Sequence, residues 1–310
     1  MRLLLILLLF SFLLPFLAYR RKPVFTQALL EDLRWIRIFH YVTLSFLGAA
    51  LFLSEHPEAK HAFTHPEKIL QFLLYMMALI YAAIFAIVTN NIEDLETDKI
   101  TNPDRPLVLN KVDKKPYYMA GIICLIWSLI ISFSISRQMG LGIALISLSY
   151  YLYSCKPFKW KRMVVIAKLM IGFNSFVAAV CGFILVEGNV FDFPAVWMIF
   201  ILGPLSLAAN FIDLKDTEGD RHAGVKTIPV WIGENNARYV IAASTIATYG
   251  MASGILNILY IYPLSVGMAS LHVYLLFKKP YREKPIFYVY LSSIWTLIFI
   301  LLFYRQLLTW

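Results

Sequence analysis

Long apolar runs recur along almost the whole of this sequence. A helix that crosses the ~30 Å hydrocarbon core of a bilayer needs about 20 mostly apolar residues. Only 15% of the residues are charged, whereas a soluble domain carries roughly a quarter. The sequence therefore predicts an all-α, polytopic membrane protein built as a nine-helix transmembrane bundle. The expected spans lie near residues 35–53, 69–90, 116–136, 139–155, 164–185, 193–212, 238–256, 259–277 and 286–308.

A tenth apolar run, residues 3–19, precedes these spans and is followed at once by three basic residues. Its short length and the preceding Arg2 are typical of a signal sequence. The lack of a small-residue cleavage site before the basic triplet favours an extra membrane helix or anchor, bent at Pro15. We therefore expect an N-terminal apolar anchor or signal-like segment at 1–22 and a transmembrane domain at 23–310.

Lysine and arginine are concentrated in the loops that follow the second, fourth, sixth and eighth predicted spans. The loops on the opposite side carry few basic residues. Because cytoplasmic loops of membrane proteins accumulate positive charge, we expect the basic loops to face the cytoplasm. This distribution also accounts for the net charge of +9, so we expect no nucleic-acid partner.

The second predicted span ends in an acidic stretch, NNIEDLETDKITNPDRPLV, at residues 90–108. Asn90, Asp94 and Asp98 recur at intervals of four, which places them on one face of a helix. Carboxylates at the edge of the hydrocarbon are costly and therefore usually have a function.

A second acidic stretch, NFIDLKDTEGDRHAGVKTIPV at residues 210–230, closes the sixth predicted span on the same side. Asp216 and Asp220 repeat the spacing of four, and Asp213 precedes them. A single Asp-x-x-x-Asp pair in a loop is usually only solvated. Two copies at matching helix ends, each followed by basic residues, indicate a weak internal duplication and favour a binding site.

The residue types in these stretches indicate magnesium chemistry. Hard oxygen ligands without histidine or cysteine suit Mg²⁺ far better than zinc or copper. Magnesium usually binds a few carboxylates and completes its coordination with water and substrate phosphate. The neighbouring arginines and lysines recognise phosphate oxygens. We expect the two acidic stripes to face each other and to bind a diphosphate bridged by Mg²⁺ at the membrane surface.

These residues resemble the motifs of the UbiA superfamily of intramembrane prenyltransferases. The first stretch matches N-x-x-x-D-x-x-x-D followed by N-P-x-R-P-L, and the second matches D-x-x-x-D. A third stretch, residues 153–162, is similar to Y-S-x-x-P-x-R-L-K-R. The resemblance covers roughly residues 25–308. One departure is Asn91, where many members carry aspartate; Lys159 and Trp160 depart from the third motif.

The resemblance implies an enzyme that uses the cofactor Mg²⁺ to ionise a prenyl diphosphate. The isoprenyl group would pass to an aromatic or lipid acceptor, and pyrophosphate would be released. A terpene cyclase of the same superfamily remains an alternative, since it shares the ionisation step but needs no acceptor. An ion-coupled transporter is disfavoured, because transporter ion sites usually lie near the bilayer midplane. The expected partners are a prenyl diphosphate, a hydrophobic acceptor and membrane lipid, and the oligomeric state stays open.

The expected site residues fall into three groups. The catalytic residues expected to bind magnesium are Asn90, Asp94, Asp98, Asp216 and Asp220, with Asp213 as a further metal ligand. The cations expected to contact the diphosphate are Arg105, Lys156, Lys159, Lys161, Arg162 and Lys226. The residues expected to border the substrate are Tyr153, Ser154 and Asn174.

Three other basic residues have simpler interpretations. Lys168 lies about two turns inside the fifth predicted span, where it can extend its ammonium group toward the interface. Arg34 and Arg37 precede or begin the first span and set topology, although Arg37 is also placed to help bind phosphate.

Overall fold

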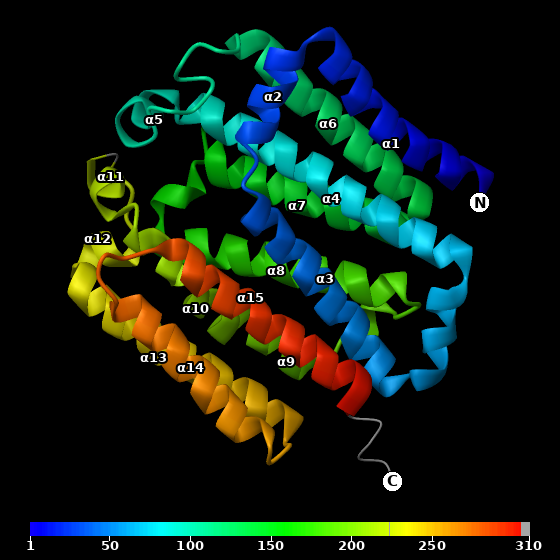
Figure 1. The fold of residues 1–310 in the computed structure, drawn as a ribbon, viewed down its shortest axis with the longest axis vertical. Coiled ribbons are helices and arrows are strands. Elements are labelled where there is room, and N and C mark those ends of the chain that lie inside the picture. Colours follow the sequence, from blue (N-terminus) through cyan, green and yellow to red (C-terminus); the bar gives the residue numbers. More distant parts are fainter. Residues whose placement is uncertain (223, 305–310) are drawn as a thin grey trace. The chain divides into compact units, whose positions relative to one another are not determined.

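The computed structural model describes residues 1–222 and 224–304, and all regular secondary structure in these ranges is helical (Figure 1). The predicted all-α class is therefore confirmed. Helices lie at all nine predicted places, and a further helix occupies the N-terminal apolar run. The last predicted span extends past this part of the chain, and its residues 305–308 lie outside the description.

The helices up to the first acidic motif are α1 (Arg2–Arg21), α2 (Pro23–Glu31), α3 (Trp35–Glu55), α4 (Pro66–Glu93) and α5 (Leu95–Thr101). The middle of the chain forms α6 (Lys114–Ile135), α7 (Arg137–Ser154), α8 (Val164–Leu185), α9 (Ala195–Phe200) and α10 (Ser206–Ala208). The remaining helices are α11 (Thr217–His222), α12 (Ile228–Ile232), α13 (Glu234–Leu256), α14 (Ile261–Phe277) and α15 (Glu283–Phe299).

Within the described ranges, eight segments are long and apolar enough to cross a membrane. They are Arg2–Arg21, Trp35–Glu55, Pro66–Glu93, Lys114–Ile135, Val165–Leu185, Ala195–Leu214, Glu234–Leu256 and Glu283–Phe303. Helix α14 is apolar but has only 17 residues, and α7 is not among the eight. The predicted number of nine is therefore approximate, while the membrane-protein class is as expected.

The chain forms two compact units, and each is described by itself. The first unit contains residues 1–159 and 177–188, and the second contains residues 160–176 and 189–310. Helix α8 passes from the second unit into the first.

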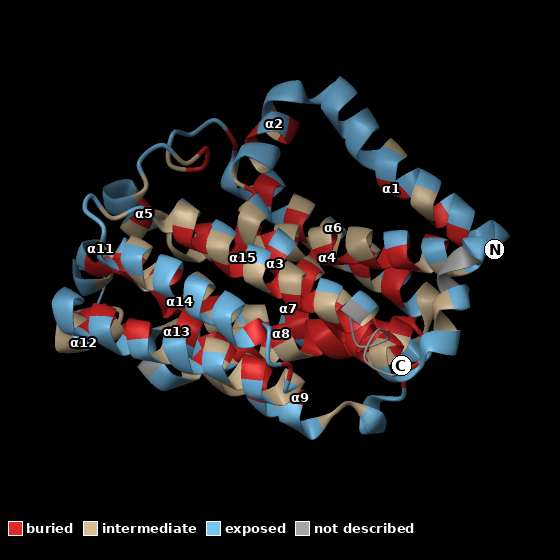
Figure 2. Ribbon diagram, turned by 60° about the horizontal axis from the view of Figure 1, so that its bottom comes forward, coloured by how far each residue is buried: buried red, intermediate tan, exposed pale blue. Residues whose placement is uncertain are grey.

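Helix α1 belongs to the first unit and continues as a helix through Pro15. Most of its surface is exposed, as Figure 2 shows, which is the pattern of a helix that faces lipid. Two hydrogen bonds to Ser11 help to attach it to the unit. The Tyr81 hydroxyl donates to the Ser11 carbonyl at 2.6 Å, and the Trp127 indole donates to its hydroxyl at 3.1 Å. The N-terminal run is thus hydrogen-bonded to α4 and α6.

Small residues allow α3 and the end of α8 to approach backbone to backbone within the first unit. A methyl group added at Gly48 would lie 1.7 Å from the carbonyl oxygen of Ala179. One added at Gly182 would lie 1.8 Å from the carbonyl oxygen of Ser45. Close helix contacts of this kind are common in membranes, where helices associate through van der Waals packing.

The second unit contains an irregular membrane segment that leads to the second acidic motif. After α9 the chain forms a π-helix at Ile201–Leu205, then α10, then a 3₁₀ helix at Ala209–Leu214. Pro204 cannot donate a backbone hydrogen bond, and Thr248 of α13 donates to its carbonyl at 2.8 Å. Side-chain donors of this kind make irregular backbone tolerable inside a membrane protein.

An aromatic cluster fixes the end of that segment. Phe211 is fully buried, with the Phe287 and Tyr290 rings of α15 at 5.4 and 6.2 Å. The Tyr281 hydroxyl also donates to the Phe211 carbonyl at 2.5 Å. The chain at Asp213 therefore emerges from a packed core.

Candidate active site

The first acidic motif keeps its four-residue spacing although helix α4 ends inside it. Asn90 lies in the last turn of α4, Asp94 forms the junction, and Asp98 lies in α5. The backbone N–H groups of Asp94 and Asp98 donate to the carbonyls four residues earlier, at 2.9 and 2.8 Å. The predicted succession of oxygen-bearing side chains along one side is therefore retained across the junction.

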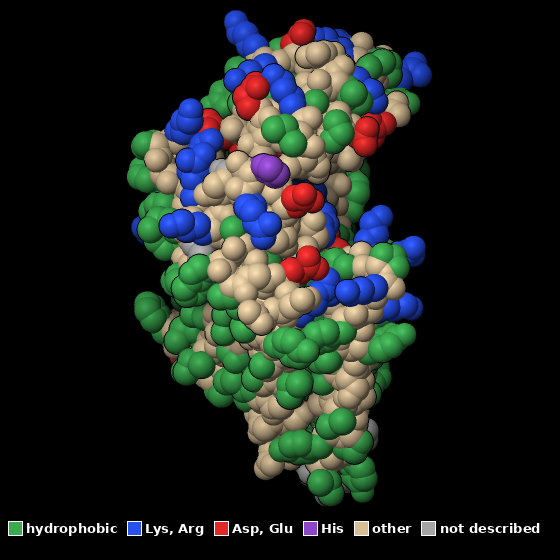
Figure 3. All heavy atoms as spheres, turned by 90° about the vertical axis from the view of Figure 1, so that its left-hand side faces the viewer, with side chains coloured by type: hydrophobic (Ala, Val, Ile, Leu, Met, Phe, Trp, Pro, Cys, Tyr) green, Lys and Arg blue, Asp and Glu red, His purple; other side chains and the backbone are tan. Residues whose placement is uncertain are grey.

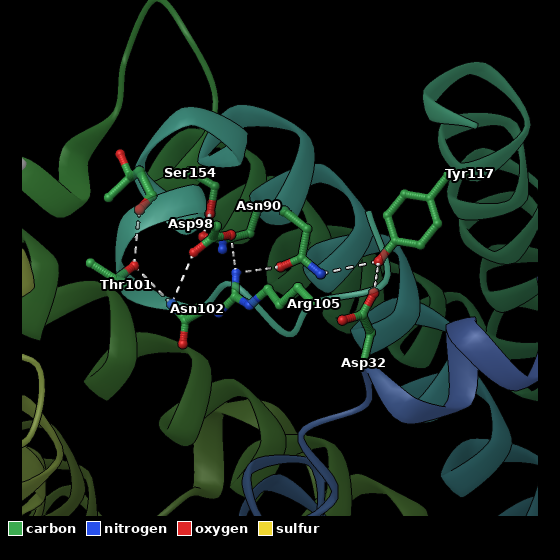
Figure 4. Close-up of polar contacts among 10 residues, drawn as sticks. Asp32, Asn90, Asp98, Thr101, Asn102, Arg105, Tyr117 and Ser154 are labelled. Atoms are coloured by element: carbon green, nitrogen blue, oxygen red, sulfur yellow. Dashed lines mark hydrogen bonds and ion pairs between the residues drawn. The ribbon is translucent and has the colours of Figure 1, made fainter. Parts of the chain in front are cut away.

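Asp98 is buried, with 4% of its surface exposed, and it has two polar partners (Figure 4). Arg105 forms an ion pair with one carboxylate oxygen, and the Asn102 amide donates to the other at 3.0 Å. Burial raises the pKa of Asp98 above its ordinary value, and Arg105 and Asn102 oppose this effect. Arg105 thus compensates a carboxylate that would be costly to bury alone.

Asn90 and Ser154, both predicted site residues, contact each other. The Ser154 hydroxyl donates to the Asn90 side-chain oxygen at 3.1 Å (Figure 4). Ser154 is the last residue of α7 and is buried. The contact therefore joins the third motif to the first at the ends of their helices.

Lys159, from the loop after α7, also reaches the first motif. Its ammonium group lies 3.2 Å from the Glu93 carboxylate and donates to the Glu93 carbonyl at 3.3 Å. Only 13% of the Lys159 side chain is exposed. The structure thus places this predicted phosphate-binding cation at the end of α4, where Glu93 is its partner.

Backbone hydrogen bonds also connect the successive carboxylates of the second acidic motif. The Asp216 N–H donates to the Asp213 carbonyl at 3.2 Å, and the Asp220 N–H donates to the Asp216 carbonyl at 2.8 Å. Asp213 lies in the 3₁₀ helix and Asp220 in α11. Asp213 therefore lies on a tighter turn that precedes the helical spacing from Asp216 to Asp220.

Asp213 has a largely buried cation as its partner. The Lys168 ammonium lies 2.5 Å from the Asp213 carboxylate, and 13% and 14% of these two side chains are exposed. Lys168 was expected only to extend toward the interface. This pairing could not be predicted from the sequence, because the partner lies on another element of the second unit.

Asp220 carries the clearest electrostatic signature of the second motif. Burial raises the pKa of Asp220 to about 7, and the negative charges of Asp213 and Asp216 add to this effect. Lys168 and Thr227 act in the opposite direction. The negative charges of Asp213 and Asp216 thus act on Asp220, and a divalent cation bound nearby would relieve this repulsion.

The two motifs supply the donors that magnesium prefers, namely carboxylate and amide oxygens. Among the residues that the structure describes, no group of three or more His, Cys, Asp or Glu side chains is already arranged around a metal position. Asp98 and Asp213 instead hold cationic side chains. The donor chemistry therefore fits Mg²⁺, and ligation by Asp98 or Asp213 would compete with these ion pairs.

The predicted site residues are distributed between the two units. The first unit holds Asn90, Asp94, Asp98, Arg105, Tyr153, Ser154, Lys156 and Lys159. The second unit holds Lys161, Arg162, Asn174, Asp213, Asp216, Asp220 and Lys226. Lys156, Arg162 and Lys226 are exposed, whereas Asn174 is buried with no described hydrogen-bond partner for its side-chain oxygen. Figure 3 shows basic side chains interspersed with acidic ones on one face.

Arg34 is a functional candidate that was expected from the sequence only to set membrane topology. It precedes α3, and its positive charge lowers the pKa values of both Asp98 and Asp32 against the effect of burial. The only feature of the sequence that pointed to Arg34 was its position before the first span. A basic residue that merely sets topology would lie at the same position.

The model of the UbiA prenyltransferase family matches residues 35–303. This chain belongs to the UbiA prenyltransferase family. The resemblance inferred from the three motifs is thereby confirmed.

Several named proteins are similar to this UbiA chain. 2-Acylphloroglucinol 4-prenyltransferase of Humulus lupulus is 30% identical over 204 residues, which cover 61% of this chain and 47% of that protein. Digeranylgeranylglyceryl phosphate synthase of Methanocaldococcus jannaschii is 26% identical over 280 residues, which cover 84% of this chain and 90% of that protein. The chain spans only about half the length of the Humulus lupulus relatives that it matches.

Solved UbiA structures share the fold. A UbiA homologue of Archaeoglobus fulgidus, described as bound to DMAPP and Mg²⁺, has a TM-score of 0.64 at 17% identity. The match covers 87% of this chain and 98% of that chain. A structure of digeranylgeranylglyceryl phosphate synthase has a TM-score of 0.57 at 23% identity, with coverage of 89% and 97%.

Proposed function

We propose that this protein is a magnesium-dependent intramembrane prenyltransferase. It transfers an isoprenyl group from a prenyl diphosphate to an aromatic or lipid acceptor and releases pyrophosphate. The observation that carries this proposal is the pairing of acidic motifs with largely buried cations, Asp98 with Arg105 and Asp213 with Lys168. Each motif thus brings carboxylates suited to a metal next to a cationic side chain.

The proposed magnesium ligands come from both motifs. They are Asn90, Asp94, Asp98, Asp213, Asp216 and Asp220. When bound, magnesium would neutralise the negative charge that develops on the departing pyrophosphate.

Arg105 and Lys159 would bind and orient the diphosphate. A guanidinium has five N–H donors, so Arg105 can keep its present contacts and still donate to a phosphate oxygen. Lys159 is held by Glu93 in a mostly buried position. Fixed cations of this kind stabilise a leaving group without reorganising during the reaction.

The bonding changes are those of an ionising substitution. The allylic C–O bond breaks, and its electron pair leaves with pyrophosphate. The acceptor then forms a bond to the allylic carbon and loses a proton. Relatives named for an acylphloroglucinol and for a glyceryl phosphate support an aromatic or a lipid acceptor.

The protein would act as an integral membrane enzyme with both motifs at the cytoplasmic surface. This orientation is inferred from the basic loops. Membrane lipid surrounds the enzyme and delivers its hydrophobic substrates.

Product analysis tests the proposed reaction. Purified protein is incubated with geranylgeranyl diphosphate and Mg²⁺, with and without a panel of aromatic and glyceryl-lipid acceptors, and products are identified by mass spectrometry. We expect a prenylated acceptor only when an acceptor is present. A cyclic hydrocarbon formed without acceptor would contradict the transferase assignment and identify a terpene cyclase.

A further inference from the structure

A short segment before the family-matched region contacts the first acidic motif. The family match begins at residue 35, and α2 with Asp32, the residue that follows it, precedes this match. Ala28 of α2 is 2% exposed and packs in one apolar cluster with Val88 of α4 and Tyr117 of α6. This packing positions Asp32 beside the end of α4.

Close contact between α4 and α6 supports the same arrangement. A methyl group added at Gly121, one turn beyond Tyr117, would lie 2.8 Å from a Val88 side-chain carbon. Glycine therefore permits α6 to approach α4 at the level where Tyr117 meets Asn91.

A chain of hydrogen bonds runs from Asp32 to Arg105. The Tyr117 hydroxyl donates to the Asp32 carboxylate at 2.6 Å (Figure 4). The Asn91 amide nitrogen donates to the Tyr117 oxygen at 3.1 Å, and Arg105 donates to the Asn91 amide oxygen at 3.0 Å. Tyr117 and Asn91 are 0% and 2% exposed.

The direction of every bond in this chain is fixed by its two ends. A guanidinium can only donate and a carboxylate can only accept. Asn91 must therefore turn its oxygen to Arg105 and its nitrogen to Tyr117, whose hydrogen must point to Asp32. Without the Asp32 acceptor, the Tyr117 hydrogen could turn to Asn91 and favour the flipped amide, which would present N–H groups to Arg105.

We propose that Asp32 is a positioning residue that holds Arg105 in place for the diphosphate, acting through Tyr117 and Asn91. Arg105 then has an anchor that does not depend on Asp98, the other side chain that holds it. The anchor keeps the guanidinium in position when Asp98 ligates magnesium. This inference rests on the proposed function of Arg105.

The neutrality of Asn91 gives this role a chemical reason. Asn91 supplies no charge to balance Arg105. Asp32 supplies a carboxylate two side chains away, and its charge is within electrostatic reach of Arg105. The stretch between the N-terminal apolar run and residue 35 would thus complete the first motif.

Binding of magnesium pyrophosphate to the full chain in detergent, measured by calorimetry, tests the inference. We expect Asp32→Ala to weaken binding about tenfold, the loss typical of a hydrogen bond to a charged group. Tyr117→Phe should weaken binding to the same extent, and the double variant should be no weaker than either single one. Asp32→Asn keeps an oxygen acceptor for Tyr117 but loses the charge, so its affinity should lie between that of Asp32→Ala and that of the wild type.

Glu31→Ala is the matched control. Glu31 is the neighbouring carboxylate, is exposed, and accepts a hydrogen bond from Gln27 at 3.0 Å. Its removal should leave the affinity unchanged. Thermal unfolding of each variant checks that binding is compared between folded proteins, and Asp32→Asn keeps the test decisive if Asp32→Ala unfolds.

The outcomes separate this inference from the proposed function. Equal affinities for wild type, Asp32→Ala and Tyr117→Phe would overturn it, as would additive losses in the double variant. A wild-type protein that binds magnesium pyrophosphate with these differences but transfers no prenyl group would refute the proposed reaction alone. Failure of the wild type to bind magnesium pyrophosphate would overturn both.

Discussion

Lys168 and Asp213 form an ion pair that is largely shielded from water, and its energetics differ from those of a surface pair. Taking two charges out of water is expensive, and their mutual attraction offsets this cost only while both are present. Removal of one partner leaves an isolated charge in a poorly solvated place. The pair is therefore a test of how the second motif is stabilised.

We expect Lys168→Met to lower the free energy of unfolding by about 3 kcal/mol. Lys215→Met is the control, because 46% of the Lys215 side chain is exposed in its pair with Glu283. Exposed pairs contribute less than about 1 kcal/mol. Chemical unfolding in detergent measures both variants, and equal losses would contradict the buried pair.

A second prediction concerns the pH dependence of the metal-free protein. The folded chain keeps a proton on Asp220 up to its pKa of about 7, whereas an unfolded chain loses it near pH 4, the ordinary value for aspartate. Because the folded state then binds more protons, this group makes stability fall as pH rises from about 4 to 7. Asp220→Asn should flatten that decline.

Thermal unfolding in EDTA across this pH range provides the measurement. Magnesium competes with the same proton, so its apparent affinity for the wild type should increase toward pH 7. A decline in stability that is as steep in Asp220→Asn as in the wild type would refute the role of Asp220.

At the scale of elements, the contact between α3 and α8 depends on residues that have no side chain. Gly48→Ala would place a methyl group 1.7 Å from a backbone oxygen, which cannot rotate away. The helices would have to separate, at a cost of about 1–3 kcal/mol.

Gly250→Ala in α13 should have the opposite effect. A methyl group there would meet nothing within 4 Å, and alanine stabilises a helix over glycine by roughly 0.5–1 kcal/mol. We therefore expect the unfolding temperature to fall in Gly48→Ala and rise in Gly250→Ala. A fall of similar size in both would show that helix packing is not the cause.

The sequence predicted the places of the helices because apolar length is a local property. It could not predict the irregular run through Pro204 that leads to Asp213. Whether proline breaks, kinks or widens a helix depends on partners such as Thr248, which lies on another helix. The four-residue spacings within the motifs were predictable, since backbone hydrogen bonds enforce them.

The cations that pair with the motifs were likewise only partly predictable from the sequence. Arg105 was assigned because it lies seven residues from Asp98 in a recognisable motif. Lys168 and Asp32 were not, since each meets its partner only through tertiary packing. Long-range contacts of single charged residues leave no periodic signal in one sequence.

At the scale of the whole molecule, the distribution of basic residues predicts the orientation in the membrane. In a variant whose three cysteines are replaced, Glu58→Cys and Lys111→Cys place labels in loops on opposite predicted sides. An impermeant maleimide should label Glu58→Cys in intact cells and Lys111→Cys only after the membrane is opened. The reverse pattern would put the acidic motifs outside the cytoplasm.

The central claim is that carboxylates from both acidic motifs serve one magnesium-dependent ionisation. The direct measurement is pyrophosphate release from geranylgeranyl diphosphate and acceptor by the wild type, Asp94→Ala and Asp216→Ala. Because metal ligation contributes several kcal/mol to such a step, we expect each variant to keep less than about a tenth of the wild-type rate while it remains folded. Release that needs no magnesium, or near-wild-type rates in both variants, would contradict the account.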